Sequence, residues 1–581
     1  MKESYSVKVE TNVPLTLRDG TVTYVDVFRP DSEGKFPALL SRTPYDKSSP
    51  QSRGGNFDPI RGALNGYAVV LQDVRGRYAS EGEFYTFVNE INDGYDSVEW
   101  VASQPWCTGK VGMYGASYVG ATQWLAAKSG APSLSGIAPT VTASDYHEGW
   151  AWQGGAFELG FNFSWAGSLT GANWANLSQR LSLSDGELNA LTDARDDMMT
   201  GFKYLPMSDV PDLKGDHTPY YYDWMKHSEY DDYWKSLSIE ESHSEISIPS
   251  LNIGGWYDIF LYGTIKNFVQ MRKLGKTETS RKGQRLLIGP WTHGGLPVSI
   301  QGEYNFGLRS SAFAIDGQAT ILKYYDYLLK GEENGFNDEK PVRIYVMGEN
   351  IWRDEDDWPL SRAIETNYYL HSEGEANTLT GDGALSTRIP EEEPVDAYAY
   401  NPLNPVPTKG GGLCCDNAHL PSGVFDQRSV EMRTDVLVYS TPSLSKSVEV
   451  TGPITVTLYA STSALDTDFT AKLVDVEPSG YARNLTDGII RARFRHPKQP
   501  TSFIEPNKVY EYQIDLWATS NLFKKGHKIR LEISSSNFPR FDRNTNTGGE
   551  IGTDETFESA LQTIYHTKQY PSHVKLPIIP R

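Results

Sequence analysis

The six residues 115–120, Gly-Ala-Ser-Tyr-Val-Gly, constrain the fold of this chain more than any other segment. A short apolar run at 110–114 precedes them, and a segment of helical composition at 121–127 follows. Glycine at both ends predicts a tight turn between strand and helix, because a Cβ there would collide with neighbouring backbone. A serine at the apex of such a turn, here Ser117, is the arrangement called a nucleophile elbow. The amides that open the following helix point to where an oxyanion could form.

The turn departs from the general elbow pattern at one position. That pattern has glycine two residues after the serine, whereas this chain has Val119 there and Gly120 one residue later. Short Gly-x-Ser turns are common, so the turn alone leaves a catalytic serine and a purely structural one equally open.

Composition excludes several classes of function. The 581 residues suggest more than one domain, and 39% hydrophobic and 12% aromatic residues are enough for substantial cores. A net charge of −20 disfavours nucleic acid as a partner, because phosphate binding needs concentrated Lys and Arg. The N-terminal residues lack an apolar signal segment, and no run approaches about 18 apolar residues. We therefore predict a cytoplasmic protein with no membrane partner.

Three cysteines, Cys107, Cys414 and Cys415, form an odd set that suits a reducing compartment, and they lack zinc-ligand spacing. The adjacent pair could be redox-sensitive, but the favoured interpretation is two small packing residues beside a glycine-rich turn. No His, Asp and Glu cluster has ligand spacing, so we predict neither a metal nor a cofactor. A small-molecule partner is expected, and a homo-oligomer is left open.

Strand and helix signals alternate over about the first 140 residues, which predicts a mostly parallel sheet covered on both faces. The strand signal disappears from 145 to 240, where aromatic residues crowd and polar helical stretches follow, such as 182–191. It returns at 249–256, 285–290 and 342–346. We expect the region 145–240 to be a helical insertion that covers the active edge of the sheet.

After residue 358 the chain reads as strands and loops. Apolar and polar residues alternate at 448–460, 510–517 and 528–534, and a Pro/Gly-rich connection is expected over 391–420. Strands with turns at such short spacing are typical of an antiparallel sandwich or jelly roll. These signals predict an α/β unit split over 1–144 and 241–357, a helical cap at 145–240, and a β-sandwich or jelly roll at 358–581.

A nucleophilic serine needs a base and an orienting acid, which in α/β-hydrolases follow in the order Asp, His. Asp258 directly follows the strand near 249–256, and His293 closely follows the strand at 285–290. Both would lie at carboxyl ends of strands, on the same edge of the sheet as Ser117. We predict that His293 takes the serine proton and that Asp258 fixes its tautomer. His147, beside the aromatic cap, is the nearest rival, and a structural role is favoured for it.

Six segments of the chain resemble the CocE/NonD hydrolases of the X-prolyl dipeptidyl-peptidase superfamily. They are 41–47 (SRTPYDK), 72–82 (QDVRG…ASEG), 115–120, 255–258 (GWYD), 289–293 (GPWTH) and 534–539 (SSSNFP). The resemblance covers nearly the whole chain and implies that the three regions are a catalytic α/β-hydrolase domain split over 1–144 and 241–357, a helical cap at 145–240, and a C-terminal jelly-roll β-sandwich at 358–581. It also accounts for Gly120, because this family places its second glycine there.

The resemblance implies further roles. Tyr45 matches a tyrosine whose hydroxyl helps to form the oxyanion hole, and the backbone N–H of Tyr118 would be the other donor. Trp150 and Trp165 fall where the family carries aromatic residues around the acyl pocket, and Phe260 follows the acid by two positions. An aromatic pocket favours a benzoyl or similar bulky acyl group.

The predicted function is a serine carboxylesterase that takes bulky, aromatic acyl groups through an acyl-enzyme intermediate. An X-Pro dipeptidyl-peptidase, or an amide or β-lactam acylase of the same superfamily, is the alternative. A free α-amino substrate needs carboxylates, and the residues after Asp258 are Ile259, Phe260 and Leu261. A remote alternative is a carbohydrate-binding jelly roll, which exposed aromatic residues on one sheet face would indicate.

Overall fold

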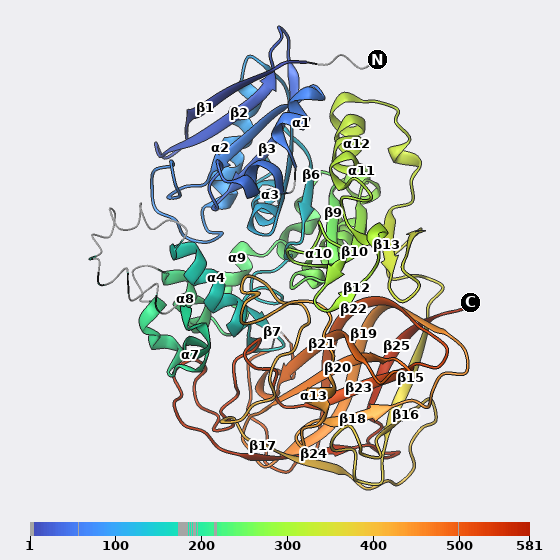
Figure 1. The fold of residues 1–581 in the computed structure, drawn as a ribbon. Coiled ribbons are helices and arrows are strands. Elements are labelled where there is room, and N and C mark those ends of the chain that lie inside the picture. The colour runs from blue at the N-terminus through green and yellow to red at the C-terminus, as the bar shows by residue number, and fades with distance from the viewer. Residues whose placement is uncertain are drawn as a thin grey trace.

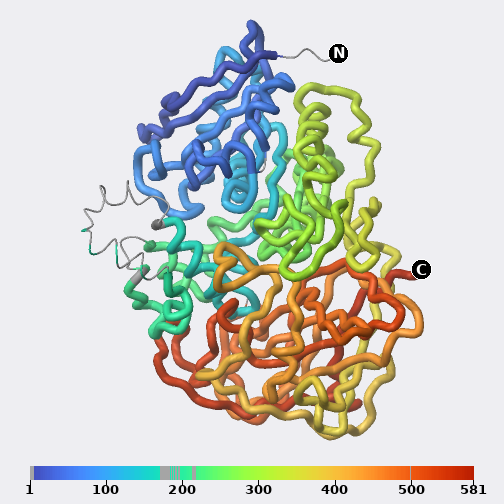
Figure 2. Tube along the Cα trace, in the orientation of Figure 1, coloured from blue at the N-terminus to red at the C-terminus, as the bar shows by residue number. Residues whose placement is uncertain are grey.

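The computed structural model describes residues 5–581 except 56, 172–183, 185, 187, 188, 190–192, 194, 195, 214–217 and 498. An upper part is built from residues up to about 140 and from 251 to 355, and a lower part from residue 364 onward (Figure 1). Figure 2 shows the blue N-terminal segment and the green-to-yellow segment side by side in the upper part, although the helical region separates them in sequence. Both segments therefore contribute to the edge of the sheet at which the active site is expected.

The upper part is a twisted sheet with parallel strands at its centre and antiparallel strands at both ends. In spatial order its strands are β1 (Val7–Thr16), β2 (Val22–Pro30), β4 (Ala68–Asp73), β3 (Phe36–Thr43), β5 (Cys107–Ala116), β6 (Leu134–Thr140), β9 (Leu251–Tyr257), β10 (Arg285–Thr292), β13 (Val342–Val346) and β14 (Ile351–Glu355). The apolar run at 110–114 and the strands predicted at 249–256, 285–290 and 342–346 are confirmed as strands, within a few residues at each end.

Helices cover both faces of this sheet, because its central strands are apolar on both sides. In β3, Leu40 packs into the cluster that includes α2 and α3, and Leu39 packs into the cluster that includes α1 and α12. Consecutive side chains of a strand point to opposite faces, so one strand serves both cores. The helices are α1 (Pro59–Leu64), α2 (Glu90–Ser103), α3 (Tyr118–Lys128), α10 (Leu261–Leu274), α11 (Glu278–Lys282) and α12 (Gly317–Lys330).

The region between β6 and β9 is mainly helical and lies beside the junction of the two sheets (Figure 1). The α-helices that the described residues form here are α4 (Leu159–Gly171), α7 (Met198–Lys203), α8 (Pro219–Lys226) and α9 (Asp232–Leu237). Aromatic stacking holds it together, as between Trp165 and Trp224 at 5.8 Å. The expectation that strands are missing here is wrong, since β7 (Trp152–Gln153) and β8 (Ala156–Phe157) form a short hairpin. Most of the helix expected at 182–191 lies outside the described residues.

The lower part is a β-sandwich with mostly antiparallel pairing. Its elements are β15 (Ile364–His371), β16 (Ala384–Ser386), β17 (Asp396–Tyr400), α13 (Arg428–Glu431), β18 (Leu437–Ser440), β19 (Val448–Thr462), β20 (Asp468–Val476), β21 (Ala482–Arg491), β22 (Tyr510–Phe523), β23 (Lys528–Ser534), β24 (Ala560–Tyr565) and β25 (His573–Ile579). The expected connection at 391–420 is wrong in one respect, because β17 lies inside it and pairs with β24.

The two parts share an apolar core, in which Trp256 and Tyr257 at the end of β9 pack with residues of the β-sandwich. The Tyr257 hydroxyl donates to the backbone oxygen of Asn484 at 2.9 Å. The sandwich therefore supports the strand that precedes Asp258. The division into domains at 144, 240 and 357 stays a prediction.

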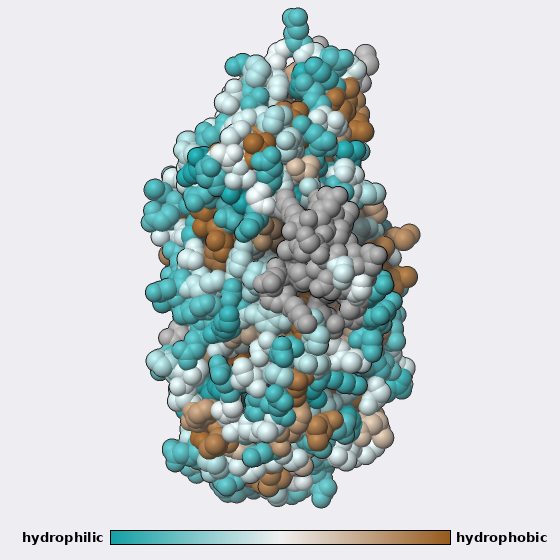
Figure 3. Space-filling model, turned by 90° about the vertical axis from the view of Figure 1, so that its left-hand side faces the viewer, coloured by the Kyte–Doolittle hydropathy of each residue, from teal (hydrophilic) through white to brown (hydrophobic). Residues whose placement is uncertain are grey.

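The surface on the side shown in Figure 3 is mostly hydrophilic, with apolar residues in small separate groups. This distribution agrees with the acidic composition of the chain. Among the described residues, no helix is both long and apolar enough to cross a membrane.

Candidate active site

Ser117 lies between β5 and α3, at the turn that the sequence singled out. Its backbone has φ 61° and ψ −126°, a conformation that L-residues rarely adopt and that functional sites often contain. Its amide donates to the backbone oxygen of Thr140 at 2.9 Å, which ties the turn to the end of β6. The residue is half-buried, so it remains open to a small molecule.

The two glycines of the turn are sterically required. A Cβ on Gly115, whose φ is +137°, would lie 2.2 Å from a methyl group of Val119. A Cβ on Gly120 would lie 2.8 Å from the Cβ of Thr142. Val119 therefore fills the space that Gly115 leaves, which explains how the turn tolerates valine where the general pattern has glycine.

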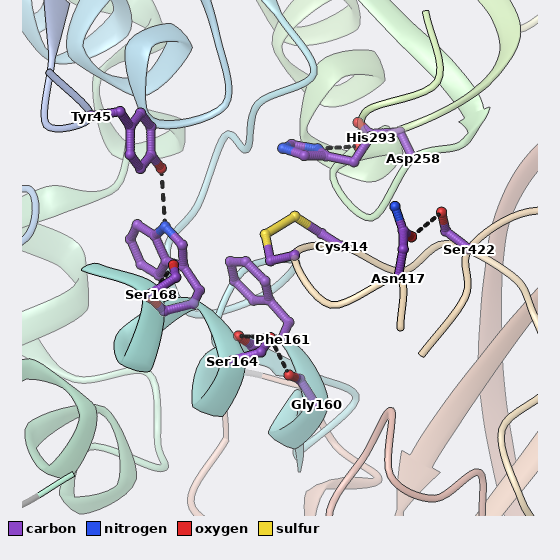
Figure 4. Close-up of a disulfide and its surroundings, with 12 residues drawn as sticks. Tyr45, Gly160, Phe161, Ser164, Ser168, Asp258, His293, Cys414, Asn417 and Ser422 are labelled. Carbon is purple, nitrogen blue, oxygen red and sulfur yellow. Dashed lines mark hydrogen bonds and ion pairs between the residues drawn. A yellow bond between two sulfur atoms is a disulfide. The ribbon is translucent and has the colours of Figure 1, made fainter. Parts of the chain in front are cut away.

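Asp258 and His293 form a hydrogen-bonded pair on the same edge of the sheet. Asp258 follows β9 and His293 follows β10, and the His293 Nδ1 lies 2.7 Å from Asp258 Oδ1. The aspartate side chain is fully buried, whereas the histidine side chain is 13% exposed. Because Nδ1 faces the carboxylate, Nε2 lies on the opposite side of the ring. In Figure 4 the ring extends from Asp258 into the space across from Tyr45.

Tyr45 lies on the turn after β3 and faces the same space. Its hydroxyl accepts a hydrogen bond of 3.0 Å from the indole N–H of Trp165, and it also hydrogen-bonds Ser117. Burial raises the pKa of Tyr45 to about 12, although the bonds from Trp165 and Ser117 lower it in part. Tyr45 is therefore a neutral hydrogen-bond donor at ordinary pH. The bond from Trp165 occupies an oxygen lone pair and leaves the phenol proton able to point elsewhere.

Two sequence motifs pair with each other to hold Tyr45. Buried Arg42 donates from Nε to Gln72 at 3.0 Å, and buried Lys47 contacts Asp73 through both its Nζ, at 2.9 Å, and its amide, at 2.8 Å. Tyr45 lies between these two anchors on the same turn. Residues 41–47 and 72–76 are thus a single structural unit, which sequence reasoning had not recognised.

A second buried network lies beneath Tyr118. The Tyr118 hydroxyl donates to Glu90 at 2.9 Å, and the Arg42 guanidinium lies 2.8 Å from the other oxygen of Glu90. Burial raises the pKa of Glu90, and the charge of Arg42 opposes that effect. The ring of Tyr118 is therefore fixed from below, which orients the first turn of α3. Sequence reasoning missed Glu90 because an acidic residue early in a helix usually has a solvated role.

Aromatic side chains line one side of the site. Trp150 stacks on Phe260 with ring centres 4.2 Å apart, and Phe260 meets the ring of His293 edge-on at 5.2 Å. Trp165 completes the group, at 5.2 Å from Trp150. Phe161, stacked on Trp165 at 5.5 Å, belongs to the same wall and was not predicted to be there. Its signal was the i, i+4 spacing with Trp165, which places both on one face of α4.

Cys414 and Cys415 require a correction. They were expected to be two packing residues, but they are joined by a disulfide between neighbours in the chain. Figure 4 shows this disulfide near the candidate site, with Phe161, His293 and Asp258 around it. Cys107 is a free, buried cysteine. Burial raises the pKa of its thiol, so the charged thiolate form is disfavoured.

Comparison with known proteins shows the family to which this chain belongs. The pattern described as "X-Pro dipeptidyl-peptidase (S15 family)" matches residues 19–295, and that of the "X-Pro dipeptidyl-peptidase C-terminal non-catalytic domain" matches residues 334–575. The chain is 39% identical to the cocaine esterase of Rhodococcus sp. (strain MB1 Bresler), over 99% of both chains. It is a CocE/NonD hydrolase of the S15 family.

Solved structures of CocE/NonD and related hydrolases share the whole architecture. An α-amino acid ester hydrolase has a TM-score of 0.80 and 25% identity, over 100% of this chain and 97% of the other. A CocE/NonD family hydrolase from Staphylococcus aureus has a TM-score of 0.71 and 20% identity, over 98% and 94%. The predicted fold, an α/β-hydrolase with a C-terminal jelly roll, is confirmed. As a member of this family, the chain is a serine hydrolase.

Proposed function

We propose that this CocE/NonD hydrolase is a carboxylesterase that cleaves esters with bulky, aromatic acyl groups. One observation carries the proposal: the strained turn of Ser117, which Tyr45 hydrogen-bonds, and the His293–Asp258 pair follow parallel strands at the same edge of the sheet. The similarity to a cocaine esterase supports an ester as the substrate.

In the proposed reaction, Ser117 Oγ attacks the ester carbonyl while His293 Nε2 takes its proton. Asp258 holds the imidazole through Nδ1 and stabilises its positive charge. The Tyr45 hydroxyl and the Tyr118 amide would donate to the carbonyl oxygen as it becomes an oxyanion. His293 then protonates the departing alcohol, and a water molecule hydrolyses the acyl-enzyme by the same steps.

The proposed acyl pocket consists of Trp150, Trp165 and Phe260. All three side chains are at least 97% buried and pack against one another, so they form a rigid apolar wall beside His293. Such a wall favours an aryl acyl group through apolar contact and ring stacking.

The test is a panel of benzoate esters, acetate esters, α-amino esters and an X-Pro anilide, with Ser117→Ala as the control. We expect benzoates to react fastest, and a fluorophosphonate to label Ser117 alone. Labelling of another serine, or full activity of Ser117→Ala, would overturn the proposed nucleophile.

A peptidase or acylase activity is the alternative, since the matched family is described as an X-Pro dipeptidyl-peptidase. Such substrates present a charged amine, but Ile259, Phe260 and Leu261 after the acid are apolar and buried. Faster cleavage of the X-Pro anilide than of any ester would decide for the peptidase.

A further inference from the structure

The disulfide of Cys414 and Cys415 has no part in the proposed ester reaction, yet it lies at the active site. It belongs to the segment 410–424, which is part of the connection between β17 and α13. Cys414 is buried in the same apolar cluster as Trp150, Trp165 and Phe260, whereas Cys415 is exposed. Cys414 thus lies on the buried side of the loop, near Phe161 in Figure 4, and Cys415 lies on the solvent side.

The base of this segment is tied to the turn that carries His293. Gly411 and Gly423 exchange backbone hydrogen bonds of 2.7 and 2.9 Å, which close the segment into a loop. Next to this closure, the Val424 amide donates to the backbone oxygen of Gln301 at 3.2 Å. The side-chain oxygen of Gln301 in turn accepts from the amide of Thr292, the neighbour of His293, at 2.9 Å.

The loop also packs directly on the segment that carries the acid. A Cβ on Gly412 would lie 3.2 Å from the backbone oxygen of Asp258. On its other side, Leu420 lies so close to Gly160 of α4 that a Cβ there would be 2.5 Å from its methyl group. The loop is therefore wedged between Asp258 and the helix that supplies Phe161 and Trp165.

The backbone at the disulfide is strained. Cys415 has φ +77°, in the left-handed region that a residue with a side chain rarely adopts and that persists only where its surroundings enforce it. A ring closed through neighbouring side chains enforces it, because it restricts the backbone between them. Opening the ring removes that restraint. The ring begins at Cys414, two residues after Gly412, which contacts Asp258.

We propose that the Cys414–Cys415 disulfide is a redox-sensitive positioning element, which holds the loop 410–424 against Asp258 and His293 in the active arrangement. This inference rests on the esterase function proposed above. Reduction would leave the chain folded but would let the loop shift, so that the proposed base and acid are less well placed.

The redox step balances with a dithiol as the reductant. One thiolate of the dithiol attacks the sulfur of exposed Cys415, the S–S bond breaks, and Cys414 leaves as a thiolate that takes up a proton. The second thiol of the reductant then attacks the mixed disulfide and releases Cys415 as a thiol. Two electrons pass to the protein, and the dithiol becomes a cyclic disulfide.

The test measures benzoate ester hydrolysis by the full-length protein before and after treatment with dithiothreitol, and again after reoxidation. Alkylation and mass spectrometry at each stage count the free thiols. We expect kcat to fall at least about threefold on reduction and to recover on reoxidation, since a displacement of about 1 Å at reacting groups can cost up to 10²-fold. The melting temperature should stay nearly constant, which separates positioning from general destabilisation.

Two variants serve as matched controls. The double variant Cys414→Ser/Cys415→Ser should resemble the reduced enzyme and ignore dithiothreitol, whereas Cys107→Ser should keep the full response. If the double variant does not fold, the reduction and reoxidation cycle of the wild-type protein still tests whether the disulfide affects kcat.

Several results would overturn the proposal: alkylation of both cysteines before any reduction, an unchanged kcat after complete reduction, or a double variant that still responds to the dithiol. These results are distinct from failure of the esterase function itself, which Ser117→Ala and fluorophosphonate labelling test in the oxidised enzyme.

Discussion

Two histidine–aspartate pairs of this chain have nearly the same short contact but differ in their surroundings. His293 and Asp258 lie 2.7 Å apart at the edge of the upper sheet, and His566 and Asp396 lie 2.9 Å apart inside the β-sandwich. Both carboxylates are fully buried. The first imidazole is 13% exposed and has its Nε2 on the side away from its aspartate, whereas the second is fully buried.

The second pair even includes a serine. Ser372 lies 3.3 Å from His566 Nε2, but it donates to Asp396 at 2.7 Å. His566 also uses Nδ1, which lies 3.2 Å from Glu393. Both nitrogens of this ring are thus occupied by carboxylates, so it cannot carry a proton between a serine and a substrate. A serine, a histidine and an aspartate do not by themselves form a catalytic triad. The histidine must also be accessible to substrate and must have one ring nitrogen that no carboxylate occupies.

The largest expected effect separates the two pairs by activity. His293→Ala should lower kcat on a benzoate ester about 10⁴-fold or more, and about as far as Ser117→Ala, because such residues act as a unit. His566→Ala should leave the kcat of the folded protein near that of the wild type. Kinetics on both variants, with folding checked by circular dichroism, measure the difference. An equal loss of kcat in both variants would contradict the distinction between the two pairs.

Stability should show the reverse order. Replacing the fully buried His566 in His566→Gln should lower the free energy of unfolding by about 3–5 kcal/mol, since it removes the charged partner of a buried carboxylate that then keeps only neutral donors. The corresponding loss for His293→Gln should be smaller, because its ring reaches solvent. Urea unfolding of both variants measures this, and a greater loss at His293 would contradict it.

The same pair should make stability depend on pH. Burial lowers the pKa of His566, but Asp396 and Glu393 raise it above its ordinary 6.5, so its contribution is complete below that value and is lost as pH rises through the folded-state pKa. Burial raises the pKa of Asp396, but hydrogen bonds led by that of His566 hold it below 3.8. Its contribution is lost as pH falls through that lower value. The stability advantage of the wild type over His566→Gln should therefore be largest at about pH 4–6.5 and shrink at higher pH.

Tyr45→Phe tests the proposed oxyanion hole beside the first pair. Removing one oxygen from the proposed oxyanion hole should lower kcat roughly 10²–10³-fold, or about 3–4 kcal/mol, with little change in KM. The packing around the ring should remain. Steady-state kinetics on a benzoate ester test this, and a kcat near that of the wild type would return Tyr45 to a structural role.

The smallest expected effect concerns the indole N–H of Trp165. Trp165→Phe keeps an aromatic wall but removes the donor to Tyr45, and we expect a loss of about 1 kcal/mol in transition-state stabilisation, roughly fivefold in kcat. In a Tyr45→Phe background the same change should have almost no effect, because the shared hydrogen bond is already gone. Additive losses in the double variant would show that Trp165 acts only through the acyl pocket.

Much of the fold could be predicted from the sequence because its signals are local. The glycine-flanked turn at 115–120, the apolar strands and the order of strand ends all depend on residues close together in the chain. The positions of Asp258 and His293 could be predicted for the same reason, since parallel strands bring their carboxyl ends to one edge. The short strands β7, β8 and β17 could not, because two to five residues carry too little periodicity.

The sequence by itself determined the backbone frame of the site: the elbow of Ser117 and the strand ends that precede Asp258 and His293. Tertiary structure alone decided which side chains meet across that frame. The bond between Trp165 and Tyr45 joins residues 120 positions apart, and no local pattern specifies such a contact. The disulfide joins neighbours, yet its place beside the active site depends on tertiary structure, because loop 410–424 reaches Asp258 and α4 from a distant part of the chain. Local periodicity sets where the chain turns, and long-range packing sets what each side chain touches.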